Sequence, residues 1–238
     1  SSTRSVASRA VKTATSGPSA PPQDRRRSVA RPTLDPAELA PLVGAKRAKT
    51  LTNRLEDAAV AFGNQRYVDA RRLLRALVSE APDSHMVREL LGLTQYHLGN
   101  WPDAIRQLEA LRVLSQNDVT QHPVLADCYR AQKKYAIVDE LWAELKEASP
   151  SAELVSEGRI VYAGSLVDRG KLGEAIRELE RGWKIPKRPR DHHLARAYAL
   201  ANAYEMAGEI LQARALFGWI VACAPEFSDS VDRLASLG

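Results

Sequence analysis

The sequence predicts an all-α protein built from repeated helical hairpins, preceded by a basic tail. Three observations predict this fold. After residue 34, apolar residues recur with helical periodicity, and no strand-like alternation of useful length appears. Short turns break this pattern every 15 to 20 residues, and the aromatic residues that follow three of the turns, Tyr67, Trp101 and Tyr135, are 34 residues apart. The whole basic excess of the chain lies before the first of these helices.

Residues 1–33 are predicted to be a disordered tail. They hold seven basic residues and one acid, a net charge of +6, whereas residues 34–238 hold 27 basic and 28 acidic residues. The tail contains no aromatic residue and is rich in Ser, Ala and Pro, so it buries too little apolar surface to offset the entropy of ordering. Helical order is predicted to begin at Asp35-Pro36-Ala37-Glu38, which combines an Asp N-cap, a Pro at the first helical position and a Glu at the third.

The repeat unit has small residues wherever two helices must approach closely. In the first helix of each unit these are Ala58, Gly92, Ala126, Ala163 and Ala201, and in the second helix they are Ala70, Ala104, Ala175 and Ala213. Prolines follow the second helix in three units, where they stop it before the next unit begins. The fourth and fifth units follow longer spacers, and residues 226–238 are predicted to cover the last helix as a cap.

This pattern resembles the tetratricopeptide (TPR) repeat, a 34-residue helix–turn–helix unit. Five units fit residues 51–225, and residues 35–50 are a candidate for one more helical layer. The departures are Asp57-Ala58 where Leu-Gly is usual, Val138 in place of Ala, and a fourth unit without the final proline. The resemblance implies a right-handed TPR-like solenoid over residues 34–238 with a C-terminal capping helix. The composition, rich in Ala and Arg, is also similar to that of soluble TPR proteins of high-GC bacteria.

The predicted core joins the aromatic and leucine positions of the repeats. Its largest members are Trp101, Trp142, Trp219, Leu91, Leu108, Leu125, Leu179, Leu200 and Phe217. The two cysteines, Cys128 and Cys223, are 95 positions apart and form no metal or redox motif, so both are predicted to be small core residues in a reducing compartment.

The sequence favours neither an enzyme nor a metalloprotein nor a membrane protein. It contains no phosphate-binding glycine motif, no nucleophile elbow and no zinc-protease motif. His192 and His193 point about 100° apart on a helix, and no second cluster of His or Cys accompanies them. The longest apolar stretch, residues 215–224, is half of what a bilayer requires, and the first residues lack the apolar segment of a secretory signal. We therefore expect a cytoplasmic protein without cofactor or metal.

The TPR resemblance implies that the first helices line a concave surface that binds a protein or peptide partner. The candidate partner-binding residues are Tyr96, His97, Asp127, Arg130, Tyr198, Asn202 and Glu205, and Met86 and Glu89 share this face. The Lys/Asn/Arg clamp of chaperone-binding TPR proteins is absent, because its positions hold Leu55, Ala59, Leu90, Thr120 and Val124. A mixed aromatic and charged groove favours a non-catalytic adaptor or scaffold. The alternative is that these side chains merely solvate a helix face.

Two basic segments favour a second hypothesis, an RNA- or ribosome-associated factor held by its tail. The candidate basic contacts are Arg25, Arg26 and Arg27 in the tail and Lys187, Arg188 and Arg190 in the spacer before the fifth unit. Such contacts to phosphates are sensitive to salt and blind to sequence. The alternative is a solvated linker and a solvated loop.

Overall fold

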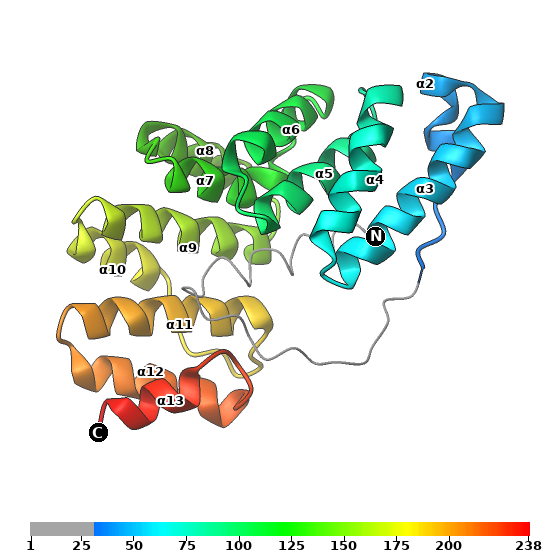
Figure 1. Cartoon of the computed structure of the whole chain (residues 1–238). Helices are drawn as coiled ribbons and strands as arrows, with labels where there is room; N and C mark the ends of the chain where they lie inside the picture. The colour runs from blue at the N-terminus through cyan, green and yellow to red at the C-terminus, as the bar shows by residue number, and fades with distance from the viewer. Residues whose placement is uncertain (1–30) are drawn as a thin grey trace. The chain divides into compact units, whose positions relative to one another are not determined.

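The computed structural model describes residues 31–238, and within this range every regular element is a helix. The predicted all-α fold is thereby confirmed (Figure 1). Contacts divide the described chain into two compact units, residues 31–132 and 133–238. None of the helices in residues 31–238 has the length and apolar character needed to cross a membrane.

The first unit consists of two helical hairpins between short flanking elements. Its elements are η1 (Pro36–Glu38), α2 (Ala40–Val43), α3 (Ala45–Gly63), α4 (Tyr67–Glu80), α5 (His85–His97), α6 (Trp101–Leu114), η2 (Val119–Gln121) and α7 (His122–Ala131). Helix α3 pairs with α4 and α5 pairs with α6, and α7 packs against α6. The predicted start is confirmed, because the Asp35 carboxylate accepts a hydrogen bond from the Ala37 amide at 2.9 Å.

The second unit repeats this plan and ends in a cap. Its helices are α8 (Tyr135–Ala148), α9 (Ala152–Asp168), α10 (Leu172–Glu180), α11 (Asp191–Met206), α12 (Ile210–Cys223) and α13 (Ser230–Ser236). Figure 1 shows α9 beside α10 and α11 beside α12, and α13 packs against α12 as predicted for the chain's last residues. The boundary between the units falls between α7 and α8, inside the predicted third repeat.

The small residues lie where the repeat pattern requires them. Ala70, Ala104, Ala175 and Ala213 of the second helices are completely buried. At Gly92 the approach of α5 to α6 is so close that a methyl group on its Cα would lie 2.7 Å from Cδ2 of Leu108. Gly158, which the repeat pattern did not single out, is equally enclosed by Leu145 and Trp142.

Most of the predicted core is confirmed. Leu91, Leu108, Leu125, Leu179, Leu200, Phe217 and Trp142 are buried, whereas Trp101 and Trp219 are only half-buried. Cys128 is buried as predicted. The prediction for Cys223 is wrong, since this residue is exposed at the last position of α12. Residues 215–224 are apolar on all sides, so composition alone does not show which face of α12 packs inward.

The described chain begins with a segment that is attached to α3. Arg31 donates from Nε to Oε2 of Glu56 at 2.8 Å, and its Nη1 lies 2.8 Å from Oδ1 of Asp57. The amide of Leu34 donates to the other oxygen of Glu56 at 3.0 Å. These bonds hold the pKa of Glu56 below its usual value, chiefly through the Leu34 amide and then through Arg31. The segment before η1 therefore belongs with the first hairpin.

Candidate functional site

Three of the predicted partner-binding residues form one hydrogen-bonded network in the first unit. Tyr96, near the end of α5, is 5% exposed, and its hydroxyl donates to Oδ2 of Asp127 on α7 at 2.8 Å. Arg130, one turn further along α7, donates from Nη1 to Oδ1 of Asp127 at 3.4 Å. Burial, followed by the Asp127 charge, raises the pKa of Tyr96 well above its ordinary value, so the hydroxyl is a neutral donor. The network connects α5 with α7 within the first unit.

His97 belongs to an aromatic cluster between the first two hairpins. Its ring stacks on Tyr67 with centroids 4.5 Å apart and meets Phe62 edge-on at 5.4 Å. Burial lowers its pKa to about 4, so the imidazole is neutral at physiological pH. The structure thus places His97 in a packing role, without a charge to offer a partner.

The predicted residues of the second unit all contact the C-terminal cap. The Tyr198 hydroxyl donates to Asp229, immediately before α13. Arg233 of α13 donates from Nη2 to Oδ1 of Asn202 at 2.9 Å and to Oε2 of Glu205 at 2.6 Å. The surface of α11 predicted to meet a partner is therefore occupied, at these three positions, by α13 and the residue before it.

The basic spacer is a loop, as predicted. Residues 181–190 connect α10 and α11 without regular structure, and Lys187 and Arg188 are exposed. Arg190 is the N-cap residue of α11, and its Nη1 lies 3.5 Å from Oε1 of Glu153. The other predicted basic contacts, Arg25, Arg26 and Arg27, lie outside the described residues, so binding of RNA through the tail stays a prediction.

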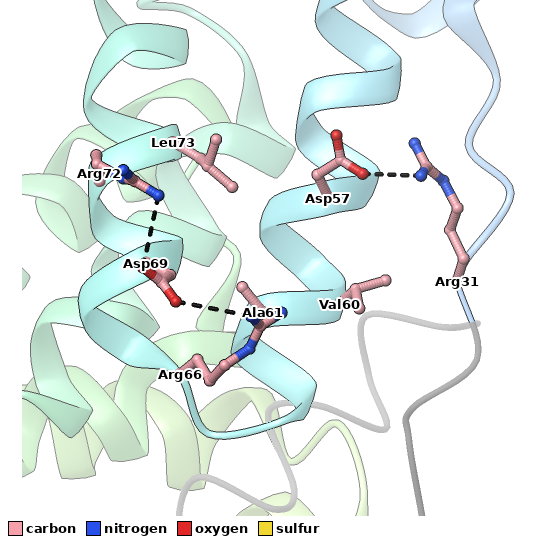
Figure 2. A pocket seen from close by; sticks show the side chains of 8 residues that line it. All are labelled: Arg31, Asp57, Val60, Ala61, Arg66, Asp69, Arg72 and Leu73. Atoms are coloured by element: carbon pink, nitrogen blue, oxygen red, sulfur yellow. Dashed lines mark ion pairs between the residues drawn. The ribbon is translucent and has the colours of Figure 1, made fainter.

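A charged pocket of about 420 Å³ lies at the first hairpin (Figure 2). Its lining residues come from α3, α4, the turn between them and the segment before η1, and are Arg31, Asp57, Val60, Ala61, Arg66, Asp69, Arg72 and Leu73. Figure 2 shows Asp69 between Arg66 and Arg72, at 3.7 Å and 3.6 Å. Because each carboxylate already faces a guanidinium, opposite charges compensate one another here.

A second pocket, of about 220 Å³, opens between α5, α6 and the start of α7. It is lined by His85, Glu89, Leu108, Leu111, Arg112, Ser115, Asp118, Thr120, Gln121, His122 and Leu125. The Gln121 side-chain amide donates from Nε2 to Oε1 of Glu89 at 2.6 Å. Burial raises the pKa of Glu89, and the nearby Asp118 carboxylate raises it further. Unlike the first pocket, this one holds a carboxylate without an ion-pair partner among residues 31–238.

Sequence reasoning identified only part of the second pocket. Glu89 was predicted to lie on the partner-facing side of its helix, but no pattern in the sequence indicated that Asp118 or Gln121 lies beside it. Both residues lie in the connection between α6 and α7, where Asp118 caps the short helix η2 through the Thr120 amide at 2.6 Å. Helical periodicity does not extend through such a connection, so it gives no information on which side chains meet there.

The part of the chain that the structure describes contains no group of three or more His, Cys, Asp or Glu side chains able to hold a metal ion. No family model matches the sequence. No curated protein matches it either. The structure is similar to the crystal structure of a thermophilic TPR protein of Thermus thermophilus, with a TM-score of 0.59 and 20% sequence identity. This likeness covers 79% of the present chain and 98% of the Thermus chain, and together with the helical hairpins it shows that the fold is TPR-like.

Proposed function

We propose that this protein is a non-catalytic adaptor that binds a segment of a partner protein on the surface of α5 and α7. The observation that carries the proposal is the Tyr96–Asp127–Arg130 network, in which a buried phenol orients a carboxylate and a guanidinium at a half-exposed position. The TPR-like fold supports the proposal through the partner-binding role that the resemblance implies for first helices.

The network suits the recognition of a polypeptide backbone. A carboxylate accepts hydrogen bonds from amide groups, and a guanidinium donates them to carbonyl groups, so Asp127 and Arg130 offer both complements side by side. Because Tyr96 already holds Asp127 in place, less side-chain entropy is lost when a partner binds. A pre-organised pair of this kind favours binding of an extended or helical segment.

The proposal includes the absence of catalysis and a cytoplasmic location. The Cys128 thiol is buried, and burial raises its pKa, so it is a poor nucleophile. Tyr96, whose pKa is also raised, is committed to Asp127. Cys223 is a free and exposed thiol, which is typical of proteins kept in a reducing compartment.

The test is quantitative affinity capture with the full-length protein as bait. The Arg130→Ala variant removes the guanidinium of the network, and Arg106→Ala is the matched control, because Arg106 is an exposed arginine of the same unit that pairs with Asp103 on the second helix α6. We expect the specific partner to be recovered by the wild type and by Arg106→Ala, and to be depleted roughly tenfold with Arg130→Ala. Equal recovery by all three baits would contradict the proposal.

A further inference from the structure

We infer that the pocket between α5, α6 and α7 binds the ammonium group of a lysine side chain carried by the partner segment. This inference rests on the proposed adaptor function, which it deepens by naming the chemistry that the partner must present. It is carried by three observations on the second pocket: a carboxylate without a cationic partner, a buried amide oxygen without a donor, and an apolar wall beside them.

The first observation concerns the charge in the pocket. The Glu89 carboxylate receives a single hydrogen bond, from Gln121, and forms no ion pair with the residues of the described chain. Asp118 adds a second carboxylate to the same pocket, and its Oδ1 is engaged by Thr120. Arg112 also lines the pocket, but its guanidinium lies 3.8 Å from Glu109 on its own helix. A desolvated carboxylate beside a like charge is stabilised by a cationic hydrogen-bond donor.

The second observation concerns Gln121. This residue is 7% exposed, and its Oε1 is buried without a hydrogen-bond donor in the described chain, while its Nε2 is committed to Glu89. An unsatisfied buried acceptor destabilises the folded protein, so a ligand that supplies a donor gains free energy on binding. An ammonium group carries three donors and no acceptor, which matches the acceptor oxygens that Glu89, Asp118 and Gln121 contribute to the pocket lining.

The third observation concerns the pocket wall and position. Leu108, Leu111 and Leu125 line the pocket, and lysine places an apolar four-carbon stem behind its charged end. Glu89 precedes Tyr96 by seven residues on α5, and residues with this spacing lie on the same side of a helix. A segment bound along α5 at the Tyr96–Asp127–Arg130 network can therefore place a side chain in the pocket.

The experiment follows the backbone amide NMR signals of the full-length protein during titration with Nα-acetyl-lysine methylamide. The norleucine analogue, which has the same stem without the amine, and the arginine analogue are the comparison probes. We expect saturable shifts at residues 85–89 and 118–125 with the lysine probe, none with norleucine, and weaker binding of arginine. Glu89→Gln should weaken lysine binding roughly tenfold or more, because a charge-assisted hydrogen bond is lost.

Two variants separate loss of binding from loss of structure. Glu89→Gln keeps an acceptor for Gln121 and removes a carboxylate whose pKa is raised by burial, so its melting temperature at neutral pH should equal or exceed that of the wild type. Glu38→Gln removes the same charge from an exposed position of the first unit and should bind the lysine probe like the wild type. Gln121→Leu, which removes the orphan acceptor, should also weaken binding.

Several outcomes would overturn the inference. These are no saturable shift with the lysine probe, equal binding of norleucine, tighter binding of arginine, or unchanged affinity in folded Glu89→Gln and Gln121→Leu. If partner capture still depends on Arg130 in any of these cases, the adaptor function stands and only the lysine pocket is refuted. If the lysine probe binds while partner capture is independent of Arg130, the proposed partner surface fails instead.

Discussion

The close approach of α5 to α6 at Gly92 predicts that the effect of one substitution on stability changes sign when a neighbouring residue is removed. Gly92→Ala adds a methyl group to α5 at a point 2.7 Å from Cδ2 and 2.8 Å from Cγ of Leu108. Alanine favours the helix over glycine by about 1 kcal/mol, whereas overpacking a core costs about 1–3 kcal/mol. We therefore expect Gly92→Ala to lower the free energy of unfolding by up to about 2 kcal/mol.

Removing Leu108 should reverse this effect. Leu108 is 1% exposed, so Leu108→Ala alone should cost about 2–5 kcal/mol. In that background the added methyl group no longer meets the leucine side chain, and Gly92→Ala should stabilise by about 1 kcal/mol. The coupling between the two positions is then about 1–3 kcal/mol. Urea unfolding of the four proteins, followed by circular dichroism and by tryptophan fluorescence, measures it.

The control is a glycine without a close neighbour. Gly218 lies within α12, and a methyl group there would have no contact within 4 Å, so Gly218→Ala should stabilise by about 1 kcal/mol. If Gly92→Ala stabilises the wild type as much as Gly218→Ala does, the reasoning about the helix approach is wrong. Additive effects of Gly92→Ala and Leu108→Ala would refute it equally.

Three further predictions concern other parts of the chain. Glu56→Gln should lower the melting temperature at neutral pH, and its difference from the wild type should vanish in acid. The reason is that the pKa of Glu56 is depressed in the folded protein, so the stability that its carboxylate contributes is lost as the pH falls through that pKa. A pH-independent difference would contradict the ionic origin. An aromatic disulfide reagent should label one thiol in the native protein, Cys223, and also Cys128 after denaturation, since only Cys223 is exposed; rapid labelling of both native thiols would show that Cys128 is accessible. Removing residues 1–30, which spares the Arg31 contacts, should reduce co-sedimentation with ribosomes at low salt and have little effect at higher salt. Equal sedimentation of both forms at low salt would show that the tail does not bind ribosomes.

The helices were predictable because the residues at each helix end interrupt the apolar periodicity. The turns after Gly63, His97 and Asp168 were visible as breaks in a periodic pattern, and the structure ends a helix at each of them. The small residues Ala70, Ala104 and Ala213 were predictable for the same reason, since a helix–helix contact at fixed register excludes larger side chains. Where the helix is apolar on all sides, as around Cys223, this reasoning fails.

The candidate site was only partly predictable. The register placed Tyr96, Asp127 and Arg130 on first helices, but it did not reveal that Tyr96 is buried and holds Asp127. It also treated Tyr198 as open to a partner, although this side chain contacts the cap. The repeat register predicts on which face of its own helix a residue lies. It does not predict the hydrogen-bond partner, which comes from an element about 30 residues away in the chain.

By itself, the sequence determined the helical hairpins, their order, the buried small residues and the loop nature of the basic spacer. These properties depend on local propensity and on a residue pattern that recurs in every repeat unit. Only the tertiary structure decided that the first unit contains a pocket where Glu89, Asp118 and Gln121 meet, and that α13 and the residue before it contact Tyr198, Asn202 and Glu205. The physical reason is that hydrogen bonding, desolvation and charge compensation depend on distances between elements. An irregular connection such as that between α6 and α7 has no periodicity from which those distances could be predicted.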